Sequence, residues 1–428
     1  MAAQQRLDAI AGHINSSATT TQSPGVKKIL EKNPDDIVIT CATRTPLTKA
    51  RKGGLKDTPA EELMVHVLRA IKDKSGIDPA AVEDVCVGNV LLTAPGFHVR
   101  SAVLAAGFPE TTAASVASRF CSSGLLSIQT IASAIAIGAI EVGIAVGCES
   151  MSTNKDSPPP MSELITKHPV AKDNLQPMGW TSENVARDFH VSRDFHVSRE
   201  SQDKYAALSH NRAEHAQKQG WTADEITPVT THWVDPKTGE KKTVTVDKDD
   251  GIRPGTTFEG LQKIRSAFPQ WGPTTTGGNA SQITDGAAAV LMMKRSTADK
   301  LGQPVIAKYV KSTVVGLAPR IMGIAPSLAI PKVLDLTGLS KDDIDLWEIN
   351  EAFASMYVYC VEKLGLDINK VNVRGGAIAI GHPLGCTGTR QVVTVLSEMR
   401  RRKAKVAVTS MCVGTGMGMA GVFVYEGS

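Results

Sequence analysis

Apolar runs alternate with amphipathic segments in residues 36–147, and this alternation predicts an α/β unit. Thr58, followed by Pro59, is expected to cap the first helix. The predicted strands are 36–42, 82–90, 113–117 and 142–147, and the predicted helices are 58–74, 99–106 and a long apolar one that begins near Cys121.

A similar series of elements recurs in residues 303–428, with strands near 305–314, 344–348, 406–411 and 420–425 and helices near 325–336 and 388–401. Equal spacing over a whole helix and strand indicates a duplicated α/β domain. The pairs that match are Gly124 with Gly388 and Cys148 with Cys412, 264 residues apart, and Asn89 with Asn350, 261 apart.

Between the two series the pattern breaks into Pro-rich turns, polar helices and a charged hairpin-like stretch. We interpret this part as an insertion, a place where α/β scaffolds often carry substrate binding. The predicted organisation is a flexible targeting segment (1–35), an N-terminal domain (36–152 with 265–302), an inserted loop domain (153–264) and a C-terminal domain (303–428).

The insertion contains a tandem repeat, in which Arg187–Ser192 recurs as Arg193–Ser198. Six extra residues inside a helix would turn its downstream part out of register. Because Ser198 precedes Arg199 and Glu200 like a helix cap, the repeat is predicted to lengthen a turn between helices.

Composition narrows the function classes. The 428 residues are 42% hydrophobic and 21% charged, which is typical of a globular protein of two or three domains. A net charge of +4 with 4% aromatic residues suits an anionic small molecule and argues against nucleic acid. The apolar run 125–147 contains Gln129 and Glu141, so it predicts a buried helix and strand and no membrane span.

The N-terminal residues resemble a targeting signal. Arg6-Leu7, five residues and His13-Ile14 resemble the type 2 peroxisomal targeting signal, whose last position is usually Leu. The segment predicts a peroxisomal protein recognised by the import receptor for that signal. An incidental amphipathic tail is the alternative.

Three polar positions stand at tight turns. Cys121 begins the long apolar helix, where the helix dipole and free N–H groups favour a thiolate, although a small buried hydrophobe is the commoner role. His382 lies in a Gly- and Pro-rich loop before a helix, and Cys412 ends a strand before a Gly-rich turn. The Gly416–Gly421 pattern G-x-G-x-x-G is too near the chain end for a dinucleotide fold.

The repeat brings the strand ends of the two halves together, so Cys121, His382 and Cys412 are predicted to share one pocket with Asn350. A nucleophilic thiol, a base, a second thiol and N–H donors form an acyl-transfer site. The seven cysteines form no C-x-x-C pair, which predicts free thiols and no zinc site.

These segments resemble the thiolase family, and the match runs from about residue 36 to the C-terminus. The four signatures are Cys-Ser-Ser-Gly at 121–124, Asn-Glu-Ala-Phe at 350–353, Gly-His-Pro-Leu-Gly at 381–385 and Cys-Val-Gly-Thr-Gly at 412–416. Pro177-Met178-Gly179 resembles the peroxisomal 3-ketoacyl-CoA branch of fungi. The resemblance implies two βαβαβαββ halves in αβαβα layers and a homodimer.

The resemblance also implies thiolytic cleavage of 3-ketoacyl-CoA by CoA, giving acetyl-CoA and a shortened acyl-CoA through acyl-Cys121. His382 would activate Cys121, Cys412 would move protons, and Asn350 and Gly414 would stabilise oxyanions. No metal or redox cofactor is implied, and CoA is a substrate. The residues implied to line the CoA and acyl channel are Met178, Phe268, Ser281, Ala352 and Phe353.

Two alternatives stay open. A biosynthetic acetoacetyl-CoA thiolase commonly has His-Met-Gly where this chain has Pro177-Met178-Gly179. A non-catalytic carrier of lipids or acyl-CoA on the same fold would not need Cys121, His382 and Cys412 together.

Overall fold

The computed structural model describes residues 23–155, 157, 159–189 and 197–427. The first half of the chain has the predicted alternation of strands and helices. Its elements are β1 (Ile37–Arg44), β2 (Thr48–Lys49), α3 (Ala60–Ser75), β3 (Asp84–Gly88), α4 (Pro95–Ala105), β4 (Ala113–Ala117), α5 (Ser123–Ala136), β5 (Val142–Ser150), β8 (Thr284–Lys294) and α10 (Arg295–Leu301).

The second half repeats this series after residue 306. Its elements are β9 (Ala307–Gly316), α11 (Pro326–Thr337), β10 (Leu346–Ile349), α12 (Ala354–Leu364), α13 (Ala377–Ile380), α14 (Thr387–Arg402), β11 (Val406–Val413) and β12 (Met417–Tyr425). In the first half, β3 pairs in parallel with β4. In the second half, β10 has only a single parallel bridge at the matching place, between Trp347 and Val371. Each half is therefore βαβαβαββ in outline, with one strand nearly lost in the second.

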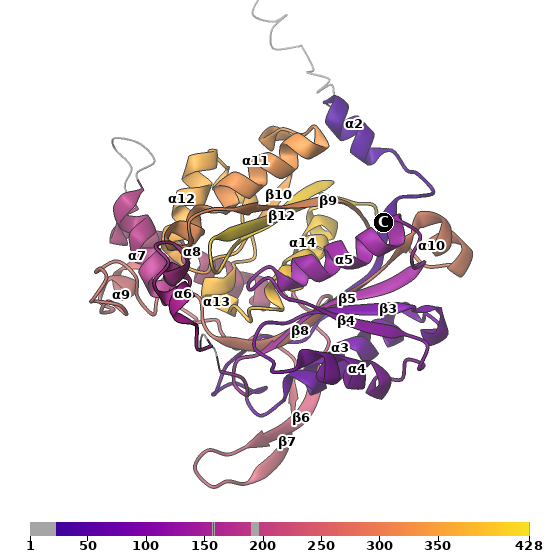
Figure 1. Cartoon of the computed structure of the whole chain (residues 1–428), viewed down its shortest axis with the longest axis horizontal. Coiled ribbons are helices and arrows are strands. Elements are labelled where there is room, and N and C mark those ends of the chain that lie inside the picture. Colours follow the sequence, from indigo (N-terminus) through magenta and orange to yellow (C-terminus); the bar gives the residue numbers. More distant parts are fainter. Residues whose placement is uncertain (1–22, 156, 158, 190–196, 428) are drawn as a thin grey trace, which may run out of the picture.

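The strands form one hydrogen-bonded path in the order β10-β11-β12-β9-β1-β8-β5-β3-β4, with β2 on β8. The halves meet where β1 pairs with β9 over only two residue pairs, Val38 with Lys308 and Ile39 with Ala307. Because this link is short, the two halves fold over as separate layers, with α5 and α14 between them in Figure 1.

Helices also cover the outer faces: α3 and α4 lie on the first half, and α11 and α12 on the second (Figure 1). The middle layer is apolar on both sides, as Leu125 and Ile128 of α5 and Val392 and Leu396 of α14 are buried in one cluster. Burying each such side chain contributes about 1.5–3 kcal/mol. The five-layered αβαβα fold expected from the sequence is confirmed.

The insertion supplies α6 (Glu163–Thr166), α7 (Met178–Asp188), α8 (Arg199–Lys218), β6 (Val229–Val234), β7 (Lys241–Val246) and α9 (Phe258–Gln262). Helices α7 and α8 pack against α12 of the second half, and β6 and β7 form the predicted hairpin, which projects from the body in Figure 1. The domain boundaries proposed from the sequence stay predictions.

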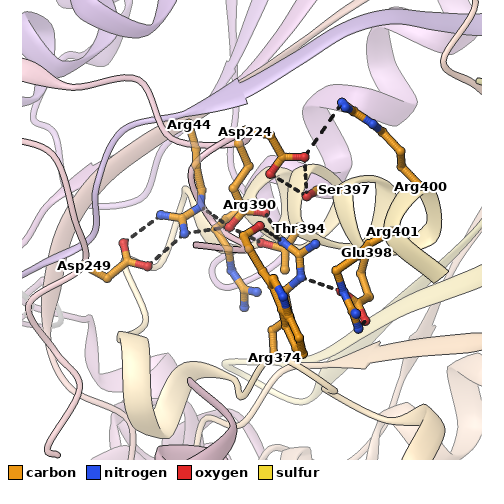
Figure 2. A network of polar contacts seen from close by, with 12 residues as sticks. Arg44, Asp224, Asp249, Arg374, Arg390, Thr394, Ser397, Glu398, Arg400 and Arg401 are labelled. Atoms are coloured by element: carbon orange, nitrogen blue, oxygen red, sulfur yellow. Dashed lines mark hydrogen bonds and ion pairs between the residues drawn. The ribbon is translucent and has the colours of Figure 1, made fainter. Parts of the chain in front are cut away.

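A buried ion network joins the insertion to both halves (Figure 2). Arg44, at the end of β1, is fully buried and donates to Glu225 at 2.7 Å and to Asp249 at 2.7 Å. Arg374 lies 3.6 Å from Glu225 and donates to Glu398 of α14 at 2.6 Å. Such a network stabilises the fold only while every charge keeps its partner.

Several local expectations need correction. Helix α3 begins at Ala60 after an N-cap at Pro59, and the Thr58 hydroxyl bonds the Thr231 hydroxyl at 2.9 Å and caps nothing. Within the segment expected to be flexible, Pro24–Leu30 form α2, and its Val26 and Ile29 pack on α11. An apolar face this small becomes ordered only because α11 offers a partner surface.

The tandem repeat begins with the last two residues of α7, Arg187 and Asp188, and ends at Ser198 before α8. Residues 190–196 are outside the described part. Ser198 caps α8 as predicted, since its side chain accepts a hydrogen bond from the Ser201 N–H at 3.0 Å. The targeting-like residues 6–14 are also outside the described part. Within it, no helix combines the length and the hydropathy that a bilayer crossing requires.

Candidate active site

His382 lies in the loop between α13 and α14, residues 381–386, which we call the His382 loop. Its backbone N–H is shared by the Gln282 carbonyl at 3.0 Å and the Thr284 hydroxyl at 3.1 Å. Gly381 has φ +101°, and a Cβ there would come within 2.0 Å of the Thr284 hydroxyl oxygen. Only glycine fits this close approach, which explains the glycine before the histidine.

Both ring nitrogens of His382 have partners. Nδ1 lies 2.6 Å from the Thr387 hydroxyl, and that hydroxyl donates to the Pro383 carbonyl at 3.2 Å. Thr387 therefore accepts from Nδ1–H, which leaves the lone pair on Nε2. Nε2 in turn lies 3.4 Å from the amide nitrogen of Asn350. This tautomer, assigned from the hydrogen bonds, presents a basic nitrogen to the site.

Burial keeps this imidazole neutral. His382 is 6% exposed, and burial lowers its pKa to about 3, with the Arg390 guanidinium adding to the effect. The lone pair of Nε2, which faces the Asn350 amide at 3.4 Å, is therefore unprotonated in the resting protein and can accept a proton. The residue is thus suited to act as a general base.

Cys412, near the end of β11, is held in its protonated form, whereas Nε2 of His382 is unprotonated. Its sulfur lies 3.7 Å from that of Met356, and its side chain is buried among apolar residues. Burial raises the pKa of Cys412 well above its ordinary value, and the electrostatic interaction with Cys121 raises it further. Cys412 is therefore a thiol that holds its proton until a strong base appears.

Cys121 lies in the turn before α5, next to Phe120, whose φ is +44°. The free N–H groups expected around it are partly engaged, because Ser122 donates to the Arg119 carbonyl and Ser123 to the Phe120 carbonyl, both at 3.0 Å. The dipole of α5 still points its positive end toward this turn. The turn that holds Cys121 is therefore fixed by its own backbone hydrogen bonds, and only part of its N–H groups remain as donors.

Glycines bring the Cys121 turn, the His382 loop and the Cys412 turn together. A Cβ on Gly124 would lie 2.6 Å from the Thr389 nitrogen, so α5 and α14 cross without room for a side chain. A Cβ on Gly414 would lie 3.5 Å from the Phe120 ring, which places the turn after β11 against the Cys121 turn.

Asn350 stands at the end of β10, between the histidine and β11. Its backbone N–H donates to the Ser410 carbonyl at 2.9 Å, and its side chain is 2% exposed. The side-chain carbonyl oxygen is buried without a hydrogen-bond partner among the described residues. An acceptor of this kind can orient a polar group that enters the site.

The residues expected to bind CoA or the acyl chain divide into two groups. Met178, Ala352 and Phe353 belong to the apolar cluster around Cys412. Ser281 joins them through the backbone, because its N–H donates to the Ala352 carbonyl at 3.0 Å. Phe268 packs on Gly179, the residue after Met178, since a Cβ on Gly179 would meet its ring at 2.4 Å. Their binding roles stay predictions.

Sequence reasoning missed three residues that contact or influence His382 and its loop. Thr387 fixes the tautomer of His382, Arg390 lies electrostatically close to it, and Glu149 bonds the His382 loop. Thr387 could have been found, because it stands in the predicted loop five residues after the histidine. Nothing in the sequence pattern connects Glu149 with residue 385.

A buried cysteine, a neutral histidine with an unprotonated Nε2 and a second, protonated thiol are the components of an acyl-transfer site on a duplicated α/β fold. Two family models match the chain, the N-terminal thiolase domain over residues 37–296 and the C-terminal thiolase domain over 303–425. The chain belongs to the thiolase family and is an acyltransferase.

Known relatives cover the chain nearly end to end. The peroxisomal 3-ketoacyl-CoA thiolase of Yarrowia lipolytica is 49% identical over 96% of this chain and 99% of its own length. The crystal structure of the dimeric peroxisomal thiolase of Saccharomyces cerevisiae is 44% identical, with a TM-score of 0.86 over 94% of this chain and 100% of that one.

A second solved structure is more distant. Human mitochondrial 3-ketoacyl-CoA thiolase is 36% identical, with a TM-score of 0.80 over 92% of this chain and 99% of that one. Relatives from yeast, rat and Arabidopsis thaliana are named peroxisomal, and the peroxisome is the compartment of this protein.

Proposed function

We propose that the protein cleaves 3-ketoacyl-CoA with free CoA, as the last step of fatty-acid β-oxidation, through an acyl-Cys121 intermediate. The observation that carries the proposal is the tautomer of His382, which leaves Nε2 unprotonated on the side of Asn350. The interaction between Cys121 and Cys412, and the approach of Gly414 to Phe120, support a common site for the two thiols. The relatives are named 3-ketoacyl-CoA thiolases, which supports 3-ketoacyl-CoA as the substrate class.

In the first half-reaction, Nε2 of His382 takes the Cys121 proton and the sulfur attacks the keto carbon. The bond between C2 and C3 of the substrate then breaks, and its electron pair stays on C2. Cys412 gives its proton to that carbon, so acetyl-CoA leaves and acyl-Cys121 remains. A raised pKa suits Cys412 to protonate a carbanion, which is a far stronger base than water.

In the second half-reaction, the Cys412 thiolate takes the proton of free CoA. The CoA sulfur attacks the acyl group, and the departing Cys121 sulfur regains its proton from His382, which restores the starting state. Asn350 with His382 would serve one oxyanion, and the N–H groups of Cys121 and Gly414 the other. Each such donor lowers the barrier by about 3 kcal/mol.

The same proposal assigns the partners. The chain acts as a homodimer, because a relative of similar fold is described as dimeric. CoA is a substrate, no metal or redox cofactor takes part, and the import receptor for the type 2 signal recognises the N-terminal segment. Among the described residues, no group of three or more His, Cys, Asp or Glu is placed to bind a metal.

Intact-protein mass after mixing with a medium-chain 3-ketoacyl-CoA, without free CoA, tests the reaction. A mass gain equal to the shortened acyl group, lost on adding CoA and absent in Cys121→Ala, supports the proposal. An adduct with acetoacetyl-CoA alone would indicate the biosynthetic alternative. Bound ligand without an adduct would refute the proposal in favour of a carrier.

A further inference from the structure

A carboxylate outside the catalytic group connects the His382 loop to the first half of the fold. Glu149, at the end of β5, has no exposed surface. Each of its two carboxylate oxygens accepts two hydrogen bonds. The donors are the N–H groups of Gly385 at 3.0 Å and Val90 at 3.1 Å to Oε2, and those of Leu91 at 3.2 Å and the Asn89 side chain at 3.1 Å to Oε1.

We propose that Glu149 is a positioning residue for His382: its carboxylate fixes the His382 loop to residues 89–91, the loop that follows β3. The proposal rests on the proposed function of His382. All four partners are N–H donors, so only an ionised carboxylate satisfies them together. A proton on either oxygen, or an amide in place of the carboxylate, would point hydrogen at an N–H group.

The loop lies directly on the strand ends that Glu149 adjoins. A Cβ on Gly385 would be 2.8 Å from the carbonyl oxygens of Gly88 and Cys148. Gly385 is three residues from His382, so a shift of its backbone moves the imidazole away from Thr387 and Asn350. A misplacement of about 1 Å in a catalytic group can cost 100-fold in rate.

The duplication gives this arrangement a rationale. Glu149 follows Cys148 as Val413 follows Cys412, and Asn89 matches Asn350 in the repeat. In the first half, Asn89 donates to the Cys148 carbonyl at 2.8 Å as well as to Glu149. The strand ends that carry chemistry in the second half thus serve in the first to hold the catalytic loop.

The carboxylate titrates in an accessible range. Burial raises the pKa of Glu149 to about 7, although its four N–H donors oppose the shift. The titratable groups that interact with it are the thiols of Cys148 and Cys386, whose pKa values burial raises, that of Cys386 to about 12. Both stay neutral near pH 7, and so does His382. Glu348 of β10 titrates in the same range, because burial raises its pKa to about 7, and it pairs with Arg390 at 3.1 Å. An acidic loss of activity near pH 7 is therefore assigned to Glu149 by its disappearance in a variant without that carboxylate.

The test compares wild type with Glu149→Gln and Glu149→Asp between pH 5.5 and 9. We expect kcat of the Gln variant to fall at least 10-fold with KM within three-fold, and its acidic limb near pH 7 to vanish. The Asp variant, which keeps the charge, should be intermediate and keep the limb. Asp345→Asn is the matched control, since Asp345 accepts the N–H groups of Lys405 and Val406 far from the loop.

Hydrogen exchange of the wild-type enzyme provides a measurement that needs no variant. After correction for intrinsic rates, peptides covering 381–388 should lose protection as the pH falls through 7, while peptides of α3 do not. Unchanged protection, or a Gln variant with kcat within two-fold of wild type and the acidic limb intact, would overturn the proposal. Acylation of wild-type Cys121 tests the proposed function separately.

Discussion

The Nδ1 atom of His382 lies 2.6 Å from the hydroxyl oxygen of Thr387, on the first turn of α14. Since the hydroxyl proton is directed to the Pro383 carbonyl, this single contact decides which ring nitrogen carries hydrogen. The base is thereby prepared on the side of Asn350 before any substrate binds.

Replacing Thr387 by Val removes the acceptor without changing the volume, so Nδ1–H loses its partner and the other tautomer becomes accessible. We expect kcat to fall by about 100-fold, within the range of general-base catalysis, with little change in KM. Thr387→Ser keeps the hydroxyl and should restore kcat to within a few-fold. Steady-state kinetics of the three proteins measures this, and a Val variant of normal kcat would contradict the assigned tautomer.

The variant Cys412→Ala distinguishes the role of Cys412 from that of Cys121. It retains Cys121 and His382, so an activated acyl thioester should still acylate Cys121. Cleavage of a 3-ketoacyl-CoA should be lost, because the carbanion has no proton donor. Intact mass measures the first property and acetyl-CoA release the second. Normal cleavage by this variant would exclude Cys412 as the proton donor.

The depressed pKa of His382 predicts an acid-dependent loss of stability. The unfolded chain gains a proton below about pH 6.5, whereas the folded protein gains it only near pH 3. The contribution is fully present above pH 6.5 and decreases as the pH falls. Urea unfolding of wild type and His382→Asn should show their difference changing by about 3 kcal/mol from pH 7.5 to 4. A difference independent of pH would contradict the neutral buried imidazole.

Removing Arg44 should destabilise the fold strongly, since Arg44→Met takes the paired cation from the buried Asp249 carboxylate (Figure 2) and leaves Glu225 only the longer 3.6 Å contact with Arg374. We expect a loss of about 3–5 kcal/mol in the free energy of unfolding. Adding Glu225→Gln and Asp249→Asn should recover part of it. The control Lys204→Ala breaks an exposed pair and should cost less than about 1 kcal/mol.

Deleting residues 193–198 should leave kcat/KM within a few-fold of wild type. After the deletion Ser192 directly precedes Arg199, so a serine still caps α8, and Val191 takes the sequence position of the buried Val197. Adding Ser192→Ala to the deletion should cost about 1 kcal/mol through the lost cap. A deletion variant that fails to fold would show that the repeat does more than lengthen the turn.

The strands and the inner helices of the two halves follow from the sequence, because apolar period and length are local properties. Strand Ala113–Ala117 is predicted to the residue. Helix α2 was not predicted, since its stability comes from α11, some 300 residues away. The Thr58 cap failed for a similar reason, because the hairpin strand β6 offers its hydroxyl another partner.

The candidate catalytic residues were predicted from their turns and from the family signatures, and their roles stay predictions. Their protonation could not be predicted from the sequence. The sequence by itself determined the duplicated architecture and singled out Cys121, His382 and Cys412 as candidates. The tertiary structure decided the tautomer of His382, the protonated state of Cys412 and the attachment of the His382 loop to Glu149. These depend on burial and on hydrogen bonds between residues up to 236 positions apart, which no local pattern encodes.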